Sequence, residues 1–271
     1  IGAVLIVVLM SVAVLEERIP TYASPVSTAT KNPVGALILG DSMMLTLDYN
    51  TAAWRSRHDV ISSSTTVLGC GIGPSFRPVF HRHLIFGNAK CHLRPDGSWP
   101  LESLWANSIA TSHPDVVVVG AGRWETHDHV IGDRTYSISD RWFLEQMTRG
   151  LDDISNASRE VGARVILLTT PCTHSGETKM GHAWPEDSPE RQRTYNDFIR
   201  LYAATHVATS VLDIASRMCP GGHFSYFDAS GRYMIRNADG VHYGPGAGPF
   251  LGDWFWSQIR LAGEQSPRWM Q

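Results

Sequence analysis

Short apolar runs alternate with longer segments of helical periodicity along most of the chain. The runs are rich in Val, Ile and Leu and predict buried strands at Ala36–Leu39, Val60–Leu68, Pro114–Val119, Ala163–Thr169 and Ser210–Asp213. The segments between and after them predict helices at Met43–Trp54, Leu101–Thr111, Arg141–Val161, Pro189–Ala204 and Gly248–Ala262. Apolar strands separated by helices are typical of a parallel sheet covered by helices on both faces. The pattern predicts an α/β fold, a three-layer α/β/α sandwich with a central parallel sheet, over residues 34–271.

The start of the chain has a different pattern. Residues 1–15 are apolar and uncharged, and residues 16–33 are polar, with several Ser, Thr and Pro. A helix of about 15 residues covers about 22 Å, less than the bilayer core of about 30 Å. Since the sequence begins without Met, we interpret residues 1–15 as the end of a longer apolar membrane helix, with a signal-peptide core as the alternative. Residues 16–33 are then a linker or neck.

Composition narrows the classes of function. The formal net charge is −3 over 271 residues, and no run of Lys and Arg occurs. This argues against nucleic acid as a partner. No pair of the four cysteines forms a C-x-x-C motif, which argues against a zinc site. Their even number, after an apolar start, favours two disulfides outside the cytoplasm. The economical pairing joins Cys70 to Cys91 and Cys172 to Cys219. Four unpaired buried thiols are the alternative.

Two motifs far apart in the sequence carry the candidate chemistry. Gly40-Asp41-Ser42 follows the first predicted strand, and Asp239-Gly240-Val241-His242 lies in a loop rich in Gly and Pro. A serine hydroxyl becomes a good nucleophile when an imidazole takes its proton and a carboxylate orients that imidazole. Sites of parallel α/β sheets lie beyond the carboxyl ends of the strands, where Ser42 falls. The alternatives are a helix N-cap for the first motif and a surface turn for the second.

The two motifs resemble the first and last blocks of the SGNH (GDSL-type) hydrolase family. The resemblance implies Ser42 as nucleophile, His242 as base and Asp239 as acid, with no metal or organic cofactor. It also implies an oxyanion hole formed by the backbone N–H groups of Ser42 and Gly69, with Gly71 as the competing glycine. The alternative for these glycines is a tight turn near a disulfide.

The third block of that family carries an Asn that donates to the oxyanion, and this sequence has none there. The strand ending at Val119 leads instead into Gly120-Ala121-Gly122-Arg123-Trp124-Glu125. Arg123 is a candidate replacement donor; the other option is that backbone N–H groups alone suffice. The alternative is a structural salt bridge of Arg123 with Glu125 or Asp128.

Further segments resemble one subgroup, the extracytoplasmic SGNH domain fused behind the membrane domain of acyltransferase-3 proteins, especially those of actinobacteria. The segments are Gly122–Glu125, Leu167–Pro171, Trp184–Asp187, Arg193–Asn196, Cys219–Gly222 and Arg236–Tyr243. The resemblance implies a membrane-anchored, extracytoplasmic catalytic domain at residues 34–271. It would transfer an acyl group, usually acetyl, to a cell-envelope glycan, using a donor delivered by an N-terminal acyltransferase-3 membrane domain of the same protein. A carbohydrate acetylesterase with the same triad and a non-catalytic glycan-binding domain are the alternatives.

Two histidine pairs suggest a metal site at first sight. His81 and His83, and His127 and His129, are each spaced so that both imidazoles share a face in extended backbone. Neither pair has an evident third ligand, so we expect no metal.

Overall fold

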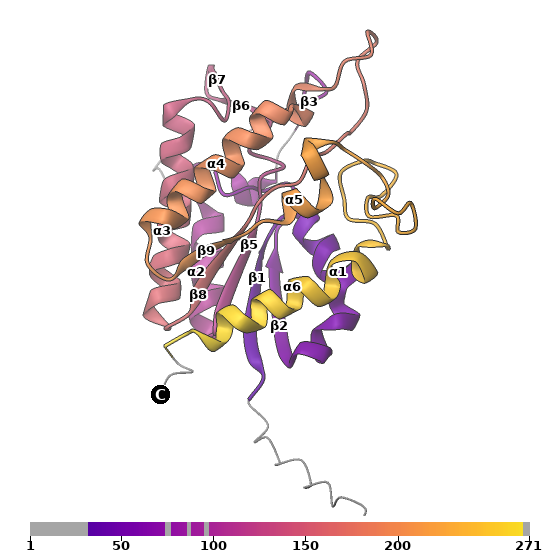
Figure 1. The fold of residues 1–271 in the computed structure, drawn as a ribbon. Helices are drawn as coiled ribbons and strands as arrows, with labels where there is room; N and C mark the ends of the chain where they lie inside the picture. The colour runs from indigo at the N-terminus through magenta and orange to yellow at the C-terminus, as the bar shows by residue number, and fades with distance from the viewer. Residues whose placement is uncertain (1–31, 74–76, 86–87, 95–97, 268–271) are drawn as a thin grey trace, which may run out of the picture. The chain divides into compact units, whose positions relative to one another are not determined.

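The fold was analysed in a computed structural model of the chain (Figure 1), which describes residues 32–73, 77–85, 88–94 and 98–267. The predicted membrane-helix end at 1–15 lies outside the described residues, as does all of the predicted linker except residues 32 and 33. Within the described ranges, no helix is both long enough and apolar enough to cross a membrane.

A five-stranded parallel sheet forms the centre of the domain. Its strands, in spatial order, are β2 (Val60–Thr66), β1 (Val34–Gly40), β5 (Val116–Gly120), β8 (Arg164–Leu168) and β9 (Thr209–Leu212). The register pairs Gly40 with Thr66 on one side and with Gly120 on the other. The carboxyl ends of β1, β2 and β5 therefore meet at one edge of the sheet, where the loops that follow them are neighbours.

Helices cover both faces of this sheet (Figure 1). Alternate residues of β1 point to opposite faces: Leu37 and Leu39 belong to one core cluster, Ala36 and Ile38 to the other. The first cluster includes residues of α2 (Pro100–Ser112), α3 (Arg141–Glu160) and α4 (Pro189–Thr205). The second includes residues of α1 (Ser42–Arg55), α5 (Ile214–Met218) and α6 (Ala247–Glu264). The predicted α/β architecture with a central parallel sheet is confirmed, and each predicted helix and strand is present with ends shifted by a few residues.

A second, small antiparallel sheet was not predicted. It has the order β4 (His83–Leu84), β3 (Arg77–Phe80), β6 (Asp128–Ile131) and β7 (Arg134–Tyr136). These strands are short, and their residues are mostly polar or only partly buried. They therefore carry none of the apolar run that marks a core strand.

Both predicted disulfides are confirmed. Cys70 is bonded to Cys91, and Cys172 to Cys219, with Cα–Cα distances of 5.4 and 6.1 Å. Disulfides are typical of oxidising compartments outside the cytoplasm.

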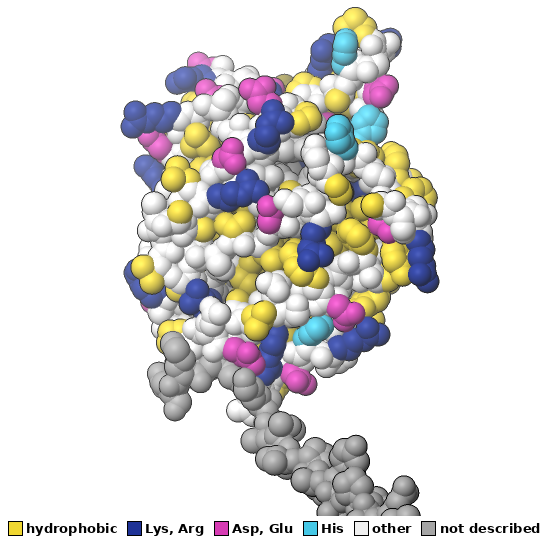
Figure 2. Space-filling view, in the orientation of Figure 1, with side chains coloured by type: hydrophobic (Ala, Val, Ile, Leu, Met, Phe, Trp, Pro, Cys, Tyr) yellow, Lys and Arg dark blue, Asp and Glu magenta, His cyan; other side chains and the backbone are white. Residues whose placement is uncertain are grey.

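On the face that α6 presents in Figure 2, acidic and basic side chains are interspersed among apolar ones.

Candidate active site

The turn between β1 and α1 places Ser42 at the amino end of a helix. Asp41 is the N-cap, and its Oδ1 accepts hydrogen bonds from the backbone N–H groups of Met43 at 2.8 Å and Met44 at 3.4 Å. The two interpretations of Gly-Asp-Ser are thus compatible, because Asp41 caps the helix and Ser42 begins it. Asp41 is fully buried, whereas Ser42 is only half-buried. The hydroxyl is left at the carboxyl edge of the sheet, where a ligand can reach it.

Ser42, His242 and Asp239 form one chain of hydrogen bonds. His242 Nε2 lies 2.8 Å from Ser42 Oγ, and His242 Nδ1 lies 2.6 Å from Asp239 Oδ2. The network assigns the Nδ1–H proton to the bond with the carboxylate, which leaves Nε2 to accept from the hydroxyl. The structure therefore brings the three sequence-predicted residues together in the geometry of a nucleophile, a general base and an orienting acid.

Hydrogen bonds to α1 hold the loop that carries His242 against Ser42. The N–H of Tyr243 donates to Thr46 Oγ1 at 3.3 Å, and Asn50 Nδ2 donates to the Tyr243 carbonyl at 3.0 Å. Gly240 turns the loop with a φ of +67°, and a Cβ there would collide with the His174 carbonyl. The Gly of Asp-Gly-Val-His is thus required both by its backbone conformation and by this close approach.

Asp239 is held as a carboxylate. Partial burial would raise its pKa, but hydrogen bonds from the His242 ring and from the N–H groups of Val241 and His242 lower it overall. The backbone donors both reach Oδ1, at 2.8 and 2.9 Å, which leaves Oδ2 for the ring. An ionised Asp239 stabilises the imidazolium that forms when His242 takes a proton.

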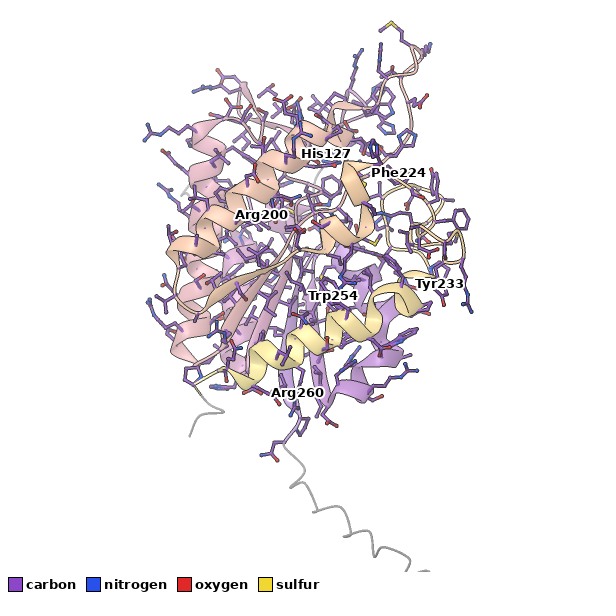
Figure 3. The ribbon with its side chains drawn as sticks, in the orientation of Figure 1. His127, Arg200, Phe224, Tyr233, Trp254 and Arg260 are labelled. Carbon is purple, nitrogen blue, oxygen red and sulfur yellow. A yellow bond between two sulfur atoms is a disulfide. The ribbon has the colours of Figure 1, made fainter. Side chains whose placement is uncertain are left out.

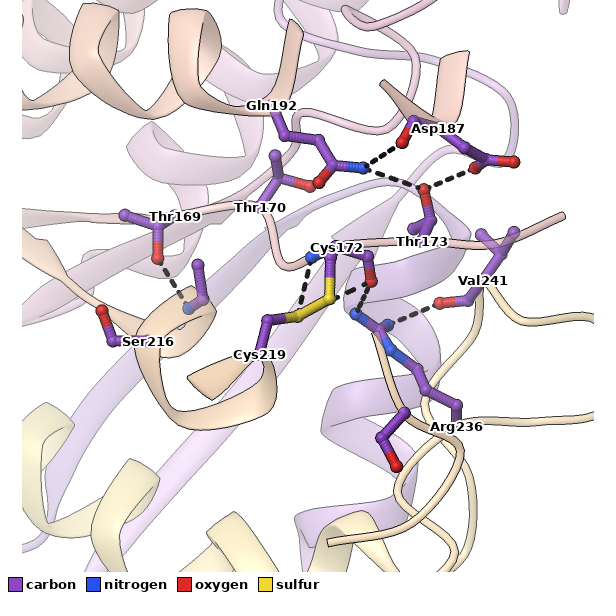
Figure 4. Close-up of a disulfide and its surroundings, with 12 residues drawn as sticks. Thr169, Thr170, Cys172, Thr173, Asp187, Gln192, Ser216, Cys219, Arg236 and Val241 are labelled. Atoms are coloured by element: carbon purple, nitrogen blue, oxygen red, sulfur yellow. Dashed lines mark hydrogen bonds between the residues drawn. A yellow bond between two sulfur atoms is a disulfide. The ribbon is translucent and has the colours of Figure 1, made fainter. Parts of the chain in front are cut away.

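Two buried charged groups were not found from the sequence. The first is Arg236, in the loop that also carries Asp239 and His242 (the triad loop). This buried arginine donates from Nη1 to the carbonyl of Val241 and from Nη2 to the carbonyl of Cys172 (Figure 4). Burial lowers the pKa of its guanidinium to about 10, so it remains charged at neutral pH. The sequence does not reveal these hydrogen bonds, because their acceptors are backbone carbonyl groups, which every residue has.

The candidate oxyanion donors are backbone N–H groups on two neighbouring loops. The N–H of Val67 donates to the carbonyl of Gly40 at 2.8 Å, which places the loop after β2 beside the turn that holds Ser42. Gly69, with a φ of +78°, follows in that loop. Within the described residues, the N–H groups of Ser42 and Gly69 donate no hydrogen bond to the protein, as an anion site requires.

Arg123 lies in a buried network rather than standing free. Its Nη1 is 2.6 Å from Asp187 Oδ1 and also donates to Thr173, while Nη2 donates to Ser175. This supports the salt-bridge alternative, with Asp187 as the acid in place of Glu125 or Asp128. Because both terminal nitrogens have these partners, we do not assign Arg123 as an oxyanion donor.

Glu125 is the second group missed by sequence reasoning. Its carboxylate is buried and accepts backbone hydrogen bonds from Gly122 and from Ile72. Burial raises its pKa, and these backbone donors oppose that shift. Burial also raises the pKa of Asp41 to about 7, with the charge of Glu125 as the second cause. The buried carboxyl groups of Asp41 and Glu125 therefore interact electrostatically, and Asp41 directly precedes Ser42 in the chain.

The histidine pair at positions 127 and 129 is buried and hydrogen-bonded to backbone groups. His127 Nδ1 donates to the carbonyl of Arg123, and His129 Nε2 to the carbonyl of Trp124, both at 2.8 Å. Burial lowers the pKa of both imidazoles, so they are neutral at physiological pH. His127 lies beneath α4 in Figure 3. No group of three or more potential metal ligands occurs among the described residues.

Comparison with known proteins gives the fold. No protein-family model and no curated protein matches the sequence. Among solved structures, a GDSL-like lipase from Bacteroides thetaiotaomicron VPI-5482 has a TM-score of 0.51 and 11% identity over 85% of this chain and 88% of that one. The chain has the fold of the GDSL-type hydrolases.

Two further solved structures share this fold, and their names refer to an acetyltransferase and to an esterase. The periplasmic domain of a lipopolysaccharide acetyltransferase from Salmonella ser. Paratyphi A has a TM-score of 0.54 and 12% identity over 84% of each chain. A catalytic mutant of an acetylxylan esterase from Geobacillus stearothermophilus has a TM-score of 0.50 and 12% identity over 84% of this chain and 94% of that one. At such identities the likeness establishes the fold, so the chemistry must be argued from the site itself.

Proposed function

We propose that this protein is a serine-dependent enzyme that acts on O-acyl esters through an acyl-enzyme on Ser42. The observation that carries the proposal is the hydrogen-bonded chain from Ser42 Oγ through His242 to Asp239. It supplies a nucleophile, a general base and a group that orients the base, which are the parts that acyl transfer needs.

The reaction takes place in two halves. In the first, His242 Nε2 takes the Ser42 proton as Oγ attacks the ester carbonyl, and the N–H groups of Ser42 and Gly69 bind the oxyanion. The intermediate collapses to acyl-Ser42, and His242 returns the proton to the leaving oxygen. In the second half, an acceptor hydroxyl attacks the acyl-enzyme, gives its proton to His242, and releases Ser42 with its proton restored. The atoms and charges balance without a metal or an organic cofactor.

For the acceptor, we propose a hydroxyl of a cell-envelope glycan and an acetyl group as the acyl chain. Aromatic rings near the triad loop support a carbohydrate. Phe224 packs edge-on against Tyr226 at 4.9 Å and lies 5.5 Å from the ring of His174. The hydroxyl of Tyr226 is near Gly240 of the triad loop. Flat aromatic faces with a polar tip suit sugar rings, which present C–H groups on their faces and hydroxyls at their edges.

A carbohydrate acetylesterase is the second candidate, because the same acyl-enzyme precedes hydrolysis and transfer. The partial exposure of the triad supports this second candidate, since 30% of the His242 side chain and 48% of the Asp239 side chain are accessible to solvent. Water can therefore reach the acyl-enzyme in the protein alone.

We also propose that residues 1–15 join this domain to a membrane domain of the acyltransferase-3 type, which delivers the acyl donor. The support is the apolar, uncharged run of those residues and the resemblance of the subgroup segments. The reading frame upstream of Ile1 tests it: about ten hydrophobic helices would agree with the fusion, and a short secretory leader would contradict it.

Incubation with 4-nitrophenyl acetate and xylo-oligosaccharides separates transferase from esterase. Transfer predicts acetylated sugar by mass spectrometry, in an amount that rises with acceptor concentration at the expense of free acetate. An esterase yields acetate alone. Activity that persists in Ser42→Ala would contradict both forms of the proposal.

A further inference from the structure

The carboxylate of Glu125 connects the loops that follow β2 and β5. Oε2 accepts from the N–H of Gly122 at 2.7 Å, and Oε1 accepts from the N–H groups of Ile72 and, at 3.4 Å, Gly73. Only 1% of the Glu125 side chain is exposed. A buried carboxylate that accepts several backbone hydrogen bonds is a rigid connection, since each backbone donor would be unsatisfied without it.

Both connected loops lie at the candidate oxyanion hole. Ile72 follows Gly69 by three residues in the loop after β2, and Cys70 of the same loop is bonded to Cys91. Gly122 belongs to the loop after β5, where this chain lacks the expected Asn. The pairing of β1 with both β2 and β5 brings these loops to the two sides of the turn that holds Ser42.

The glycine at position 71 provides the space for this carboxylate. A Cβ on Gly71 would overlap both carboxylate oxygens of Glu125. Gly71 has no positive φ that would by itself demand glycine. The absence of a side chain at this position is therefore explained by Glu125, which is evidence, separate from the hydrogen bonds, that the two loops are fitted to each other.

We infer that Glu125 is the positioning residue of the oxyanion hole, holding the loop of Gly69 against the loop of Gly122 so that the Gly69 N–H stays aimed at the ester oxygen. This inference rests on the proposed function. The carboxylate does not touch the substrate; it acts through the backbone. It makes a side-chain amide donor from the third block unnecessary, because a fixed backbone donor needs no reorganisation when charge develops on the oxygen.

Glu125→Gln is the first test, because it keeps the shape of the side chain. The amide NH2 of Gln must face either the Gly122 N–H or the N–H groups of Ile72 and Gly73, so the hydrogen bonding to one of the two loops is lost. We expect kcat/KM for 4-nitrophenyl acetate to fall about 10- to 100-fold, which is the effect of a small misplacement of reacting groups. The enzyme concentration in this ratio is that of the chains whose serine reacts with a phosphonate. The inhibition constant of phenylboronic acid, whose tetrahedral serine adduct occupies the oxyanion hole, should rise by a similar factor.

Asp115→Asn is the matched control. Asp115 Oδ2 accepts from the Gly35 N–H at 2.8 Å, so this carboxylate also accepts a backbone hydrogen bond between neighbouring segments, here β1 and the residue before β5, but at the opposite edge of the sheet. If the carboxylates only stabilise the fold, both variants should lower the melting temperature and neither should alter turnover per labelled site or boronate affinity.

A double-mutant cycle with Gly71 completes the test. Gly71→Ala should lower kcat/KM in the wild-type background, because its methyl group displaces the carboxylate. It should add little in Glu125→Ala, where the space is empty. Wild-type kinetics in Glu125→Gln, or an equal Gly71→Ala loss in both backgrounds, overturns the inference while leaving the proposed function intact. A wild type without Ser42-dependent turnover contradicts the proposed function and, with it, this inference.

Discussion

Arg236 donates a hydrogen bond from Nη1 to the carbonyl of Val241 at 2.6 Å, one residue before the catalytic base candidate His242. Its Nη2 donates at 2.7 Å to the carbonyl of Cys172, which is fixed covalently to Cys219 (Figure 4). The position of the imidazole therefore depends on a buried cation of the same loop and on a disulfide that belongs to other parts of the chain.

Arg236→Lys should lower both activity and stability. A single ammonium cannot reproduce the fork that reaches two carbonyls, and one buried carbonyl left unpaired costs about 1–3 kcal/mol. We expect kcat/KM toward an acetyl ester to fall at least tenfold. Urea unfolding of the same variant measures the loss of stability. Arg260→Lys is the control, because Arg260 also donates to a carbonyl, that of Asp59, but lies at the far end of α6 (Figure 3). A loss no greater than that of the control would contradict the positioning role.

Removing the disulfides should distinguish their roles. In the chain-entropy model, Cys→Ser replacement of the pair 172–219 costs about 4 kcal/mol and of the pair 70–91 about 3 kcal/mol, because the first closes the longer loop. Loss of the pair 172–219 should also lower turnover, and that loss should not add fully to Arg236→Lys, since both act through the Cys172 carbonyl. Urea unfolding and ester kinetics of the single and combined variants provide the test; fully additive losses would count against a shared path.

Asp41 should give the stability an unusual dependence on pH. Burial, followed by the charge of Glu125, raises its pKa from 3.8 to about 7, while the Met43 and Met44 donors and the charge of Arg123 oppose the shift. Between these values the folded protein retains a proton that the unfolded chain has released, so stability falls as pH rises and is level above about 7.

Asp41→Asn isolates this effect, because Asn is an equally good N-cap and carries no charge. The wild type should lose stability relative to Asp41→Asn as the pH rises from about 4 to about 7. Thermal unfolding of both proteins across that range measures the difference. A difference that does not change with pH would show that Asp41 is ionised throughout.

The triad residues should behave as one unit. His242→Ala should reduce turnover nearly as much as Ser42→Ala, and the double variant should be no worse, because the two residues take part in the same proton transfer. Asp239→Asn should lose less than Ser42→Ala, about 10⁴-fold, since the carboxylate orients rather than reacts. Ester kinetics of the four variants check this order; additive losses in the double variant would argue for separate roles.

The sequence predicted the central sheet, its helices, both disulfides and the closeness of the three candidate triad residues, because each has a local signal: apolar runs, an even set of cysteines and two short motifs. The antiparallel sheet was missed because its short strands have no run of apolar residues to mark them. Arg236 and Glu125 were missed for another reason. Their partners are backbone carbonyls and N–H groups, which every residue has, so no pattern of side chains reveals them. Arg123 shows the same limit, because its acid, Asp187, is distant in sequence.

The most direct test of the account is labelling with a serine-directed fluorophosphonate, followed by mass spectrometry of the modified peptide. The account predicts one adduct per chain, on Ser42, formed by the folded wild type and absent from the Ser42→Ala variant, which should keep the wild-type melting temperature and lose ester turnover by about 10⁶-fold. An adduct on another residue of the wild type, or a folded Ser42→Ala protein that keeps its turnover, would contradict it.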